Sequence, residues 1–144
     1  MGLDMYLTKK IVKTVEKGNE EHIYVDQADV MYWRKANAIH KWFVDNVQNG
    51  IDDCKQYEVS IEQLKELIEL CKKISEKQNQ EIASVLLPTQ DGFFFGGTDY
   101  DAYYFDEIKR TYEELEQKIL GVEIFGIERP DEELKTHYYY QSSW

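Results

Sequence analysis

The sequence predicts an α+β fold, a single domain of three main helices with a small antiparallel sheet. Three observations lead to this prediction: a hairpin pattern near the amino terminus, three segments with helical spacing of apolar residues, and a sequence without internal repeats or an interdomain linker. The 144 residues, of which 42% are hydrophobic, suit one hydrophobic core. Residues 1–144 are therefore expected to form one domain, with residues from about 128 to 144 as a candidate extended tail.

The amino-terminal segment is predicted to form a β-hairpin. Residues 3–13 alternate loosely between apolar and polar side chains, and residues 22–26 are rich in β-prone types. Gly18 and Asn19 lie between the two runs and are typical turn residues. A turn signal between two β-prone runs indicates a pair of antiparallel strands.

A first helix is predicted from about Asp29, where the apolar residues begin to recur at steps of three and four. The stripe consists of Trp33, Ala36, His40, Phe43 and Val47, widened by Tyr32, Ile39 and Val44. A stripe of this width is typical of a largely buried helix. The helix is expected to end near Asn49, because Gly50 adopts the left-handed conformation of a helix cap at little cost.

A second helix is predicted over about residues 61–77. Ser60 followed by Gln63 is the pattern of a capping box, and apolar residues at helical spacing come directly after it. Residues 79–98 lack periodicity and contain Pro88 and several glycines. They are expected to form a loop or a short hairpin.

A third helix is predicted from Thr98, as its amino-terminal cap, to Gly121. Asp99 and Asp101 would lie in its first turn, where the helix dipole favours negative charge. The residues that continue at helical spacing are Phe105, Ile108, Tyr112, Leu115 and Ile119. Residues 122–127 are β-prone and predict a short additional strand.

The chain is acidic, with 17 Lys and Arg against 28 Asp and Glu and a net charge of −11. This charge disfavours general nucleic-acid binding and attraction to an anionic membrane surface. No apolar stretch has the length of a transmembrane helix. Cys54 and Cys71 are expected to be free thiols in a reducing cytoplasm, because a secreted disulfide scaffold normally contains more cysteines.

Residues 33–42 form a basic island, with three basic residues and no acidic one. On a helix Arg34, Asn37 and Lys41 share one face, which presents a guanidinium, an amide and an ammonium group to phosphate or carboxylate. Nearby aromatic rings would stack on a nucleobase. The candidate ligand-binding residues are Trp33, Arg34, Asn37, Lys41, Phe94, Tyr100 and Tyr104. The alternative is a buried amphipathic helix whose long polar side chains reach water.

His40 lies on the apolar stripe and is expected to be a neutral core histidine, with no carboxylate nearby to favour its charged form. The three tyrosines at positions 100, 103 and 104 exceed what one core face absorbs, so some are expected to line a surface or pocket. Ligand spacings match no zinc or calcium site, and no catalytic triad or carboxylate pair is apparent. No catalytic residue, metal or cofactor is therefore predicted, and enzyme activity is not expected.

Several motifs together resemble a known family. They are MGLDMYL at residues 1–7, YWRKANAIHKWFV at 32–44, DDC at 52–54, LLPT at 86–89, GFFFG at 92–96 and T-x-YD-x-YY at 98–104. Across most of its length the chain resembles the widespread family of small phage and prophage proteins that carry these motifs. The resemblance implies a phage accessory protein in the cytoplasm of an infected bacterial host.

Phage accessory proteins of this size often act against host defence, which suggests two functions by class-level analogy. The first is binding and sequestering a phosphorylated nucleotide-type immune signal without turnover, using the basic island and its aromatic neighbours. The alternative is a protein inhibitor that blocks a host defence protein through the acidic, Tyr-rich carboxy-terminal third, which contains DEE at residues 131–133 and YYY at residues 138–140. The expected partners are thus a small anionic nucleotide-type ligand or a host defence protein, without nucleic acid or membrane, and homo-oligomers are compatible with both functions.

Overall fold

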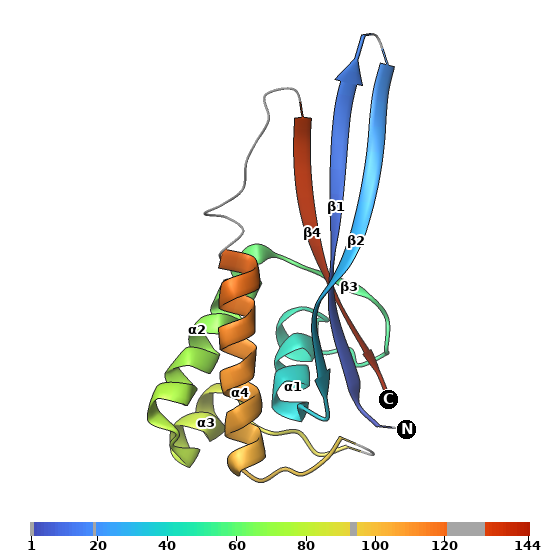
Figure 1. Cartoon of the computed structure of the whole chain (residues 1–144). Coiled ribbons are helices and arrows are strands. Elements are labelled where there is room, and N and C mark those ends of the chain that lie inside the picture. Colours follow the sequence, from blue (N-terminus) through green and yellow to red (C-terminus); the bar gives the residue numbers. More distant parts are fainter. Residues whose placement is uncertain (1, 19, 93–94, 121–131) are drawn as a thin grey trace.

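A computed structural model describes residues 2–18, 20–92, 95–120 and 132–144. The fold is α+β, as predicted, with a sheet on one side and a group of helices on the other (Figure 1). The described residues contain four α-helices, whereas the sequence predicted three. The strands are β1 (Asp4–Lys17), β2 (Glu20–Arg34), β3 (Tyr57–Val59) and β4 (Glu132–Ser143). The helices are α1 (Asn37–Asn46), α2 (Ile61–Lys77), α3 (Gln80–Leu86), α4 (Ala102–Leu115) and the π-helical turn η1 (Glu116–Leu120).

The sheet has the strand order β2-β1-β4-β3, and all neighbouring strands are antiparallel. The predicted hairpin is confirmed, although its strands are longer than expected. β1 pairs with β2 from Asp4 opposite Arg34 to Lys17 opposite Glu20, with a bulge after Leu7. β2 is therefore an edge strand over its whole length.

The first helix begins at Asn37, so the prediction that it starts near Asp29 is wrong. The residues before it belong to β2, where Met31 and Trp33 are buried opposite Leu7 and Met5 of β1. Trp33 lies three residues before Ala36 and therefore also fits a helical stripe, whereas Met31 and Trp33 are two residues apart and fit a strand. Pairing with the apolar residues of β1 decides between the two structures. The helix also ends earlier than predicted, at Asn46.

The carboxy-terminal residues form the central strand β4, so the prediction of an extended tail is wrong. β4 pairs with β1 from Ser143 opposite Asp4 to Glu132 opposite Val15, and with the short strand β3 on its other side. Tyr138 and Tyr140 are buried on the helix side of the sheet. Buried Tyr138 and Tyr140 alternate with the less buried His137, Tyr139 and Gln141, which is the pattern of a strand with one buried face.

The second helix is confirmed over Ile61–Lys77, with the predicted capping box between Ser60 and Gln63. The short helix α3 lies in the segment predicted as a loop or hairpin, and its cap is Asn79, which accepts a hydrogen bond from the backbone of Glu81. The third predicted helix is capped by Asp101 and not by Thr98, because the Asp101 carboxylate accepts from the Tyr104 backbone. The strand predicted at 122–127 lies outside the described residues.

The core lies between the sheet and the helices, around the base of the hairpin. The largest fully buried side chains there include Leu3, Met5, Leu7, Trp33, Phe43, Leu64, Leu67, Ile108 and Tyr140. Beyond the bulge, residues 8–29 of the hairpin extend past the ends of the helices (Figure 1). We call residues 8–29 the arm. Those of its side chains that the structure describes are exposed or half-buried, and Ile23 and Val25 are 64% and 62% exposed.

Deleting residues 132–144 is expected to unfold the protein, because β1 and β3 lose their shared partner and the core loses Tyr138 and Tyr140. The measurement is thermal unfolding followed by circular dichroism. Removing only Trp144, which is half exposed, serves as the control and should leave a cooperative transition. A cooperative transition in the longer deletion would contradict the assignment of β4 as a structural strand.

Candidate functional site

The basic island does not present its three predicted ligand-binding residues on one helical face. Arg34 is the last residue of β2 and is exposed, whereas Asn37 is the first residue of α1 and is buried. Lys41 lies on α1 and forms an ion pair with Asp45 at 2.5 Å. Trp33 is fully buried, and its indole N–H donates to the Thr111 hydroxyl at 2.8 Å. The shared face predicted for Arg34, Asn37 and Lys41 requires a helix that starts before Arg34. In the structure Arg34 belongs to β2, so this shared face does not form.

The Asn37 side chain holds a loop in place. Its Nδ2 donates to the backbone carbonyls of Phe95 and Gly97 at 3.0 and 2.8 Å, and its Oδ1 accepts from the backbone N–H of Gln90 at 3.0 Å. Both ends of the buried amide are therefore used within the protein. This arrangement assigns Asn37 to loop positioning.

Asn37 and Tyr104 do meet at a small pocket, which has a volume of about 70 Å³. Its lining includes Lys35, Asn37, Tyr103, Tyr104 and three acidic side chains, namely Asp99, Asp101 and Glu107. Tyr100 packs edge-on against Tyr104, with 5.0 Å between ring centroids, and Phe94 lies outside the described residues. The prediction that some of these tyrosines line a pocket is confirmed. The pocket is far smaller than the roughly 300–1,000 Å³ typical of small-molecule sites, and it is mainly acidic.

His40 is fully buried and hydrogen-bonded through both ring nitrogens. Nδ1 lies 2.7 Å from the Tyr140 hydroxyl, and Nε2 lies 2.9 Å from Oδ2 of Asp52. The other carboxylate oxygen of Asp52 accepts from the indole N–H of Trp144 at 2.9 Å. The prediction of a buried, hydrogen-bonded histidine is confirmed, but the expectation that no carboxylate is near it is wrong. Asp52 follows α1 in a loop, so the helical spacing around His40 could not reveal it.

Burial lowers the pKa of His40, and the hydrogen bond and charge of Asp52 oppose that shift only in part. The neutral ring donates from Nε2 to Asp52 and accepts at Nδ1 from the Tyr140 hydroxyl. Burial likewise raises the pKa of Tyr140 well above its usual value, so the phenol keeps its proton. Because both ring nitrogens are engaged, this network ties β4 to α1 and its following loop instead of presenting a catalytic base.

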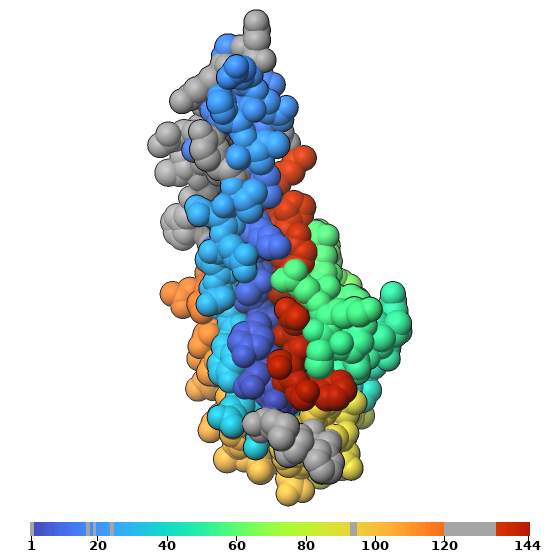
Figure 2. Space-filling view, turned by 90° about the vertical axis from the view of Figure 1, so that its right-hand side faces the viewer, coloured from blue at the N-terminus to red at the C-terminus, as the bar shows by residue number. Residues whose placement is uncertain are grey.

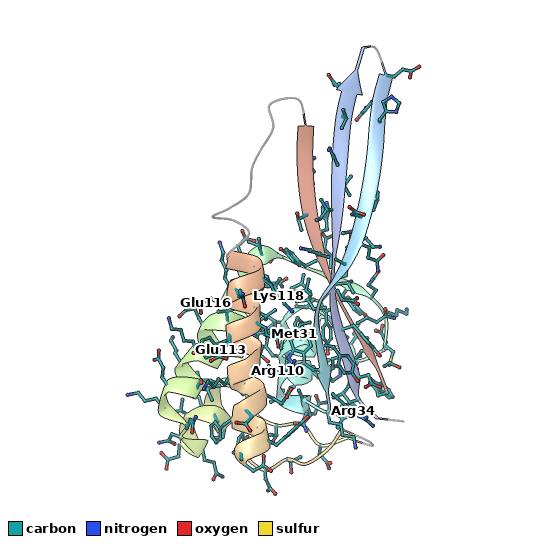
Figure 3. The ribbon with its side chains drawn as sticks, in the orientation of Figure 1. Met31, Arg34, Arg110, Glu113, Glu116 and Lys118 are labelled. Atoms are coloured by element: carbon teal, nitrogen blue, oxygen red, sulfur yellow. The ribbon has the colours of Figure 1, made fainter. Side chains whose placement is uncertain are left out.

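A groove that the sequence did not predict runs between β2 and α4. It has a volume of about 480 Å³ and is lined by Tyr6, Asp29, Val30, Met31, Tyr32, Arg110, Glu114 and Lys118. Arg110 and Lys118 lie on the side of α4 and η1 that faces the sheet (Figure 3). Glu114 separates the two cations, 3.7 Å from Arg110 and 3.5 Å from Lys118. The helical spacing of these charges was the available signal, but such spacing usually indicates only a solvated face.

Three side chains from α4 and η1 bind backbone carbonyls along the outer edge of β2. The Lys118 ammonium group donates to Val30 at 2.6 Å, and the Arg110 guanidinium donates to Tyr32 at 2.9 Å. The Tyr103 hydroxyl donates to Arg34 at 2.5 Å. Carbonyls at every second residue are those that point away from the neighbouring strand. The helix thus covers the edge of β2 near the base of the arm.

Above the groove, the edge of β2 continues along the arm. Residues 25–29 of this stretch are all exposed, and its acidic residues are Glu20, Glu21, Asp26 and Asp29. Figure 2 shows the two strands of the arm beside β4, with β2 (light blue) on one side of β1 (blue) and β4 (red) on the other. The arm therefore offers an acidic strand edge next to exposed apolar side chains.

No protein-family model, curated protein or solved structure matches the chain. Within the described ranges, no cluster of three or more His, Cys, Asp or Glu side chains is arranged to hold a metal ion. No helix in the described part of the chain has the length and apolar character needed to cross a membrane. Cys54 and Cys71 are free thiols, as predicted.

Replacing Asn37 with Ala is expected to lower the free energy of unfolding by about 1–3 kcal/mol, because it leaves the buried backbone groups of the loop without their partner. Lys41→Ala is the control, since its pair with Asp45 is largely exposed and should change stability by less than about 0.5 kcal/mol. Urea unfolding measures both. Equal and small effects would contradict the structural role of Asn37.

Stability should also depend on the protonation of His40. Its pKa is lowered in the folded protein, so the unfolded chain binds a proton more readily, and stability that is present above pH 6.5 is lost as the pH falls. His40→Gln should cost about 1–3 kcal/mol at neutral pH and weaken this acid dependence. Urea unfolding at a series of pH values measures both effects. An unchanged pH profile in the variant would rule out His40 as the titrating group.

Proposed function

We propose that this protein is a non-catalytic binding protein that captures and blocks a partner protein through its arm, at the acidic edge formed by residues 20–29 of β2. The observation that carries the proposal is the arm itself, a long hairpin with Ile23 and Val25 exposed on it. β4 pairs with the β1 strand of the arm as far as Val15, so β2 is the edge strand of the arm. Exposed apolar residues on an edge strand favour association. The arm adds little to the core, so binding is the function that best accounts for it.

Charge supports a protein partner with a basic surface. The chain carries a net charge of −11, and four acidic side chains lie on the β2 part of the arm. Complementary charge accelerates association and selects partners of opposite sign. Tyrosines 6 and 32 lie half exposed at the base of the arm, where their rings pack with centroids 5.3 Å apart. Exposed tyrosines are typical of protein-binding surfaces.

The resemblance to phage and prophage proteins supports a more specific proposal, in which the partner is a host defence protein. The identity of the partner as a host defence protein is proposed from the sequence motifs, whereas binding through the arm is proposed from its geometry. A blocking protein needs an accessible surface and no catalytic group, and His40 has both nitrogens engaged within the core. We therefore propose a phage-encoded protein that blocks a host defence protein through its arm.

Sequestration of a nucleotide-type signal has weaker support. The predicted ligand residues that the structure describes are separated between β2, α1, the loop before α4 and α4 itself. The pocket that includes two of them measures about 70 Å³. Three acidic side chains line that pocket, which disfavours a phosphate group there. A basic protein surface fits the acidic β2 edge of the arm better than an anionic small molecule does.

The test is affinity capture from a bacterial host, followed by reconstitution with the purified candidate partner. The comparison variant shortens the arm by replacing residues 14–23 with Asn-Gly, which closes the hairpin between Lys13 and its register partner Tyr24. The wild-type chain should form a stoichiometric complex, and the shortened chain should fold but bind at least about tenfold more weakly.

A nucleotide released intact from the denatured wild-type protein would instead support the sequestration function. An unaltered affinity of the shortened chain for the reconstituted partner would contradict the role of the arm. Mass spectrometry of the released small molecules and calorimetry of the complex measure these two outcomes.

A further inference from the structure

We infer that the occupant of the arm is an extended, basic segment of the partner, which pairs with the outer edge of β2 over residues 20–29 and becomes a fifth strand of the sheet. This inference rests on the proposed function and specifies its mode of binding. The edge is divided into two parts. Near the base, side chains of α4 and η1 already bind the carbonyls of Val30, Tyr32 and Arg34. Along the arm, residues 25–29 of the same strand are all exposed.

The direction of the backbone groups follows from the pairing of β1. The backbone N–H of Lys35 donates to the carbonyl of Leu3, so odd-numbered residues of β1 direct their backbone groups to β2 and even-numbered residues to β4. Val25 lies opposite the even-numbered Val12. Its N–H and C=O therefore point away from β1. An incoming strand would bond to Val25 and to alternate residues on either side of it.

Charge selects a basic segment for this edge. β2 carries Glu20, Glu21, Asp26 and Asp29 in the open stretch. Its existing neighbour β1 carries Lys9, Lys10 and Lys13 in the paired region, so the native pairing already places a basic strand beside an acidic one. A fifth strand with basic residues would repeat that arrangement on the other side. A second copy of the chain, pairing β2 with β2, would instead bring carboxylates close to carboxylates.

The exposed apolar residues of β2 indicate which side chains alternate along the partner segment. Ile23 and Val25 are two residues apart and lie on one face of the sheet, beside Val12. Asp26 lies on the other face. A strand that alternates apolar and basic side chains would cover Ile23 and Val25 on the first face and place positive charge near Asp26 on the second. The inferred ligand class is therefore a segment with alternating β-branched and Lys or Arg residues.

The test uses a synthetic peptide of alternating Val and Lys, acetylated and amidated at its ends, and a matched peptide of alternating Val and Glu. Calorimetry should show saturable binding of the Lys peptide that weakens with added salt, and little binding of the Glu peptide. Nuclear magnetic resonance of the full chain should show slowed amide exchange at alternate residues of β2. Equal binding of both peptides, or exchange protection elsewhere, would overturn the inference.

Two variants separate backbone pairing from charge. Val25→Pro removes the outward N–H without removing a bond to β1 and should abolish peptide binding, whereas Val25→Thr keeps the N–H and should bind within a few-fold of wild type. Asp26→Lys with Glu20→Lys, two acidic residues on the same face, should weaken binding by about tenfold and keeps the test valid if the proline variant fails to fold. Wild-type affinity in the double charge variant would contradict the inferred charge selection.

The outcomes distinguish this inference from the proposed function. Binding of a reconstituted partner that is insensitive to Val25→Pro and to both charge reversals would overturn the fifth strand and leave the arm as a binding surface. If neither the partner nor the Lys peptide binds, both proposals fail. A concentration-dependent dimer in sedimentation experiments, lost in Val25→Pro, would assign the edge to a second copy and overturn the basic occupant.

Discussion

The placement of β4 between β1 and β3 is the constraint on which the rest of the structure depends. Tyr140 of β4 contacts α1 in two ways. Its ring stacks on Phe43 with centroids 3.8 Å apart, and its hydroxyl lies 2.7 Å from Nδ1 of His40. Through His40 the same side chain is linked to Asp52 in the loop after α1. The end of the chain thus joins the sheet, the first helix and a distant loop in one buried network, where loss of any member leaves the others unsatisfied.

This network completes the core at the base of the hairpin. None of the described residues of the arm belongs to that buried core. The division is visible along β2, where Met31 and Trp33 are buried while Ile23 and Val25 are exposed. The edge of β2 follows the same division, since α4 and η1 supply donors only to carbonyls near the base among the contacts described above. Burial, backbone pairing and charge therefore all change at the same point of the chain, which is why function is assigned to the arm.

The sequence predicted the elements whose signals are local. The turn at Gly18 marked the hairpin, and the box formed by Ser60 and Gln63 marked the start of α2. The wrong predictions concern elements that long-range pairing decides. Residues 29–34 were assigned to a helix from their spacing, but they pair with β1. Residues 132–143 were predicted as part of a tail, but they also pair with β1. The site was predicted less well for the same reason. The face expected for Arg34, Asn37 and Lys41 assumed a helix that tertiary pairing replaces with a strand.

Amide hydrogen exchange along the hairpin tests the central claim, that the arm is a folded strand pair with one open edge, most directly. Slow exchange is expected throughout residues 9–15 of β1, whose neighbours β2 and β4 lie on both sides. In residues 21–28 of β2 we expect alternation, with slow exchange at residues that face β1 and fast exchange at those that face outward. Fast exchange of the whole arm, or uniform protection of β2 in the free protein, would contradict this structure of the arm.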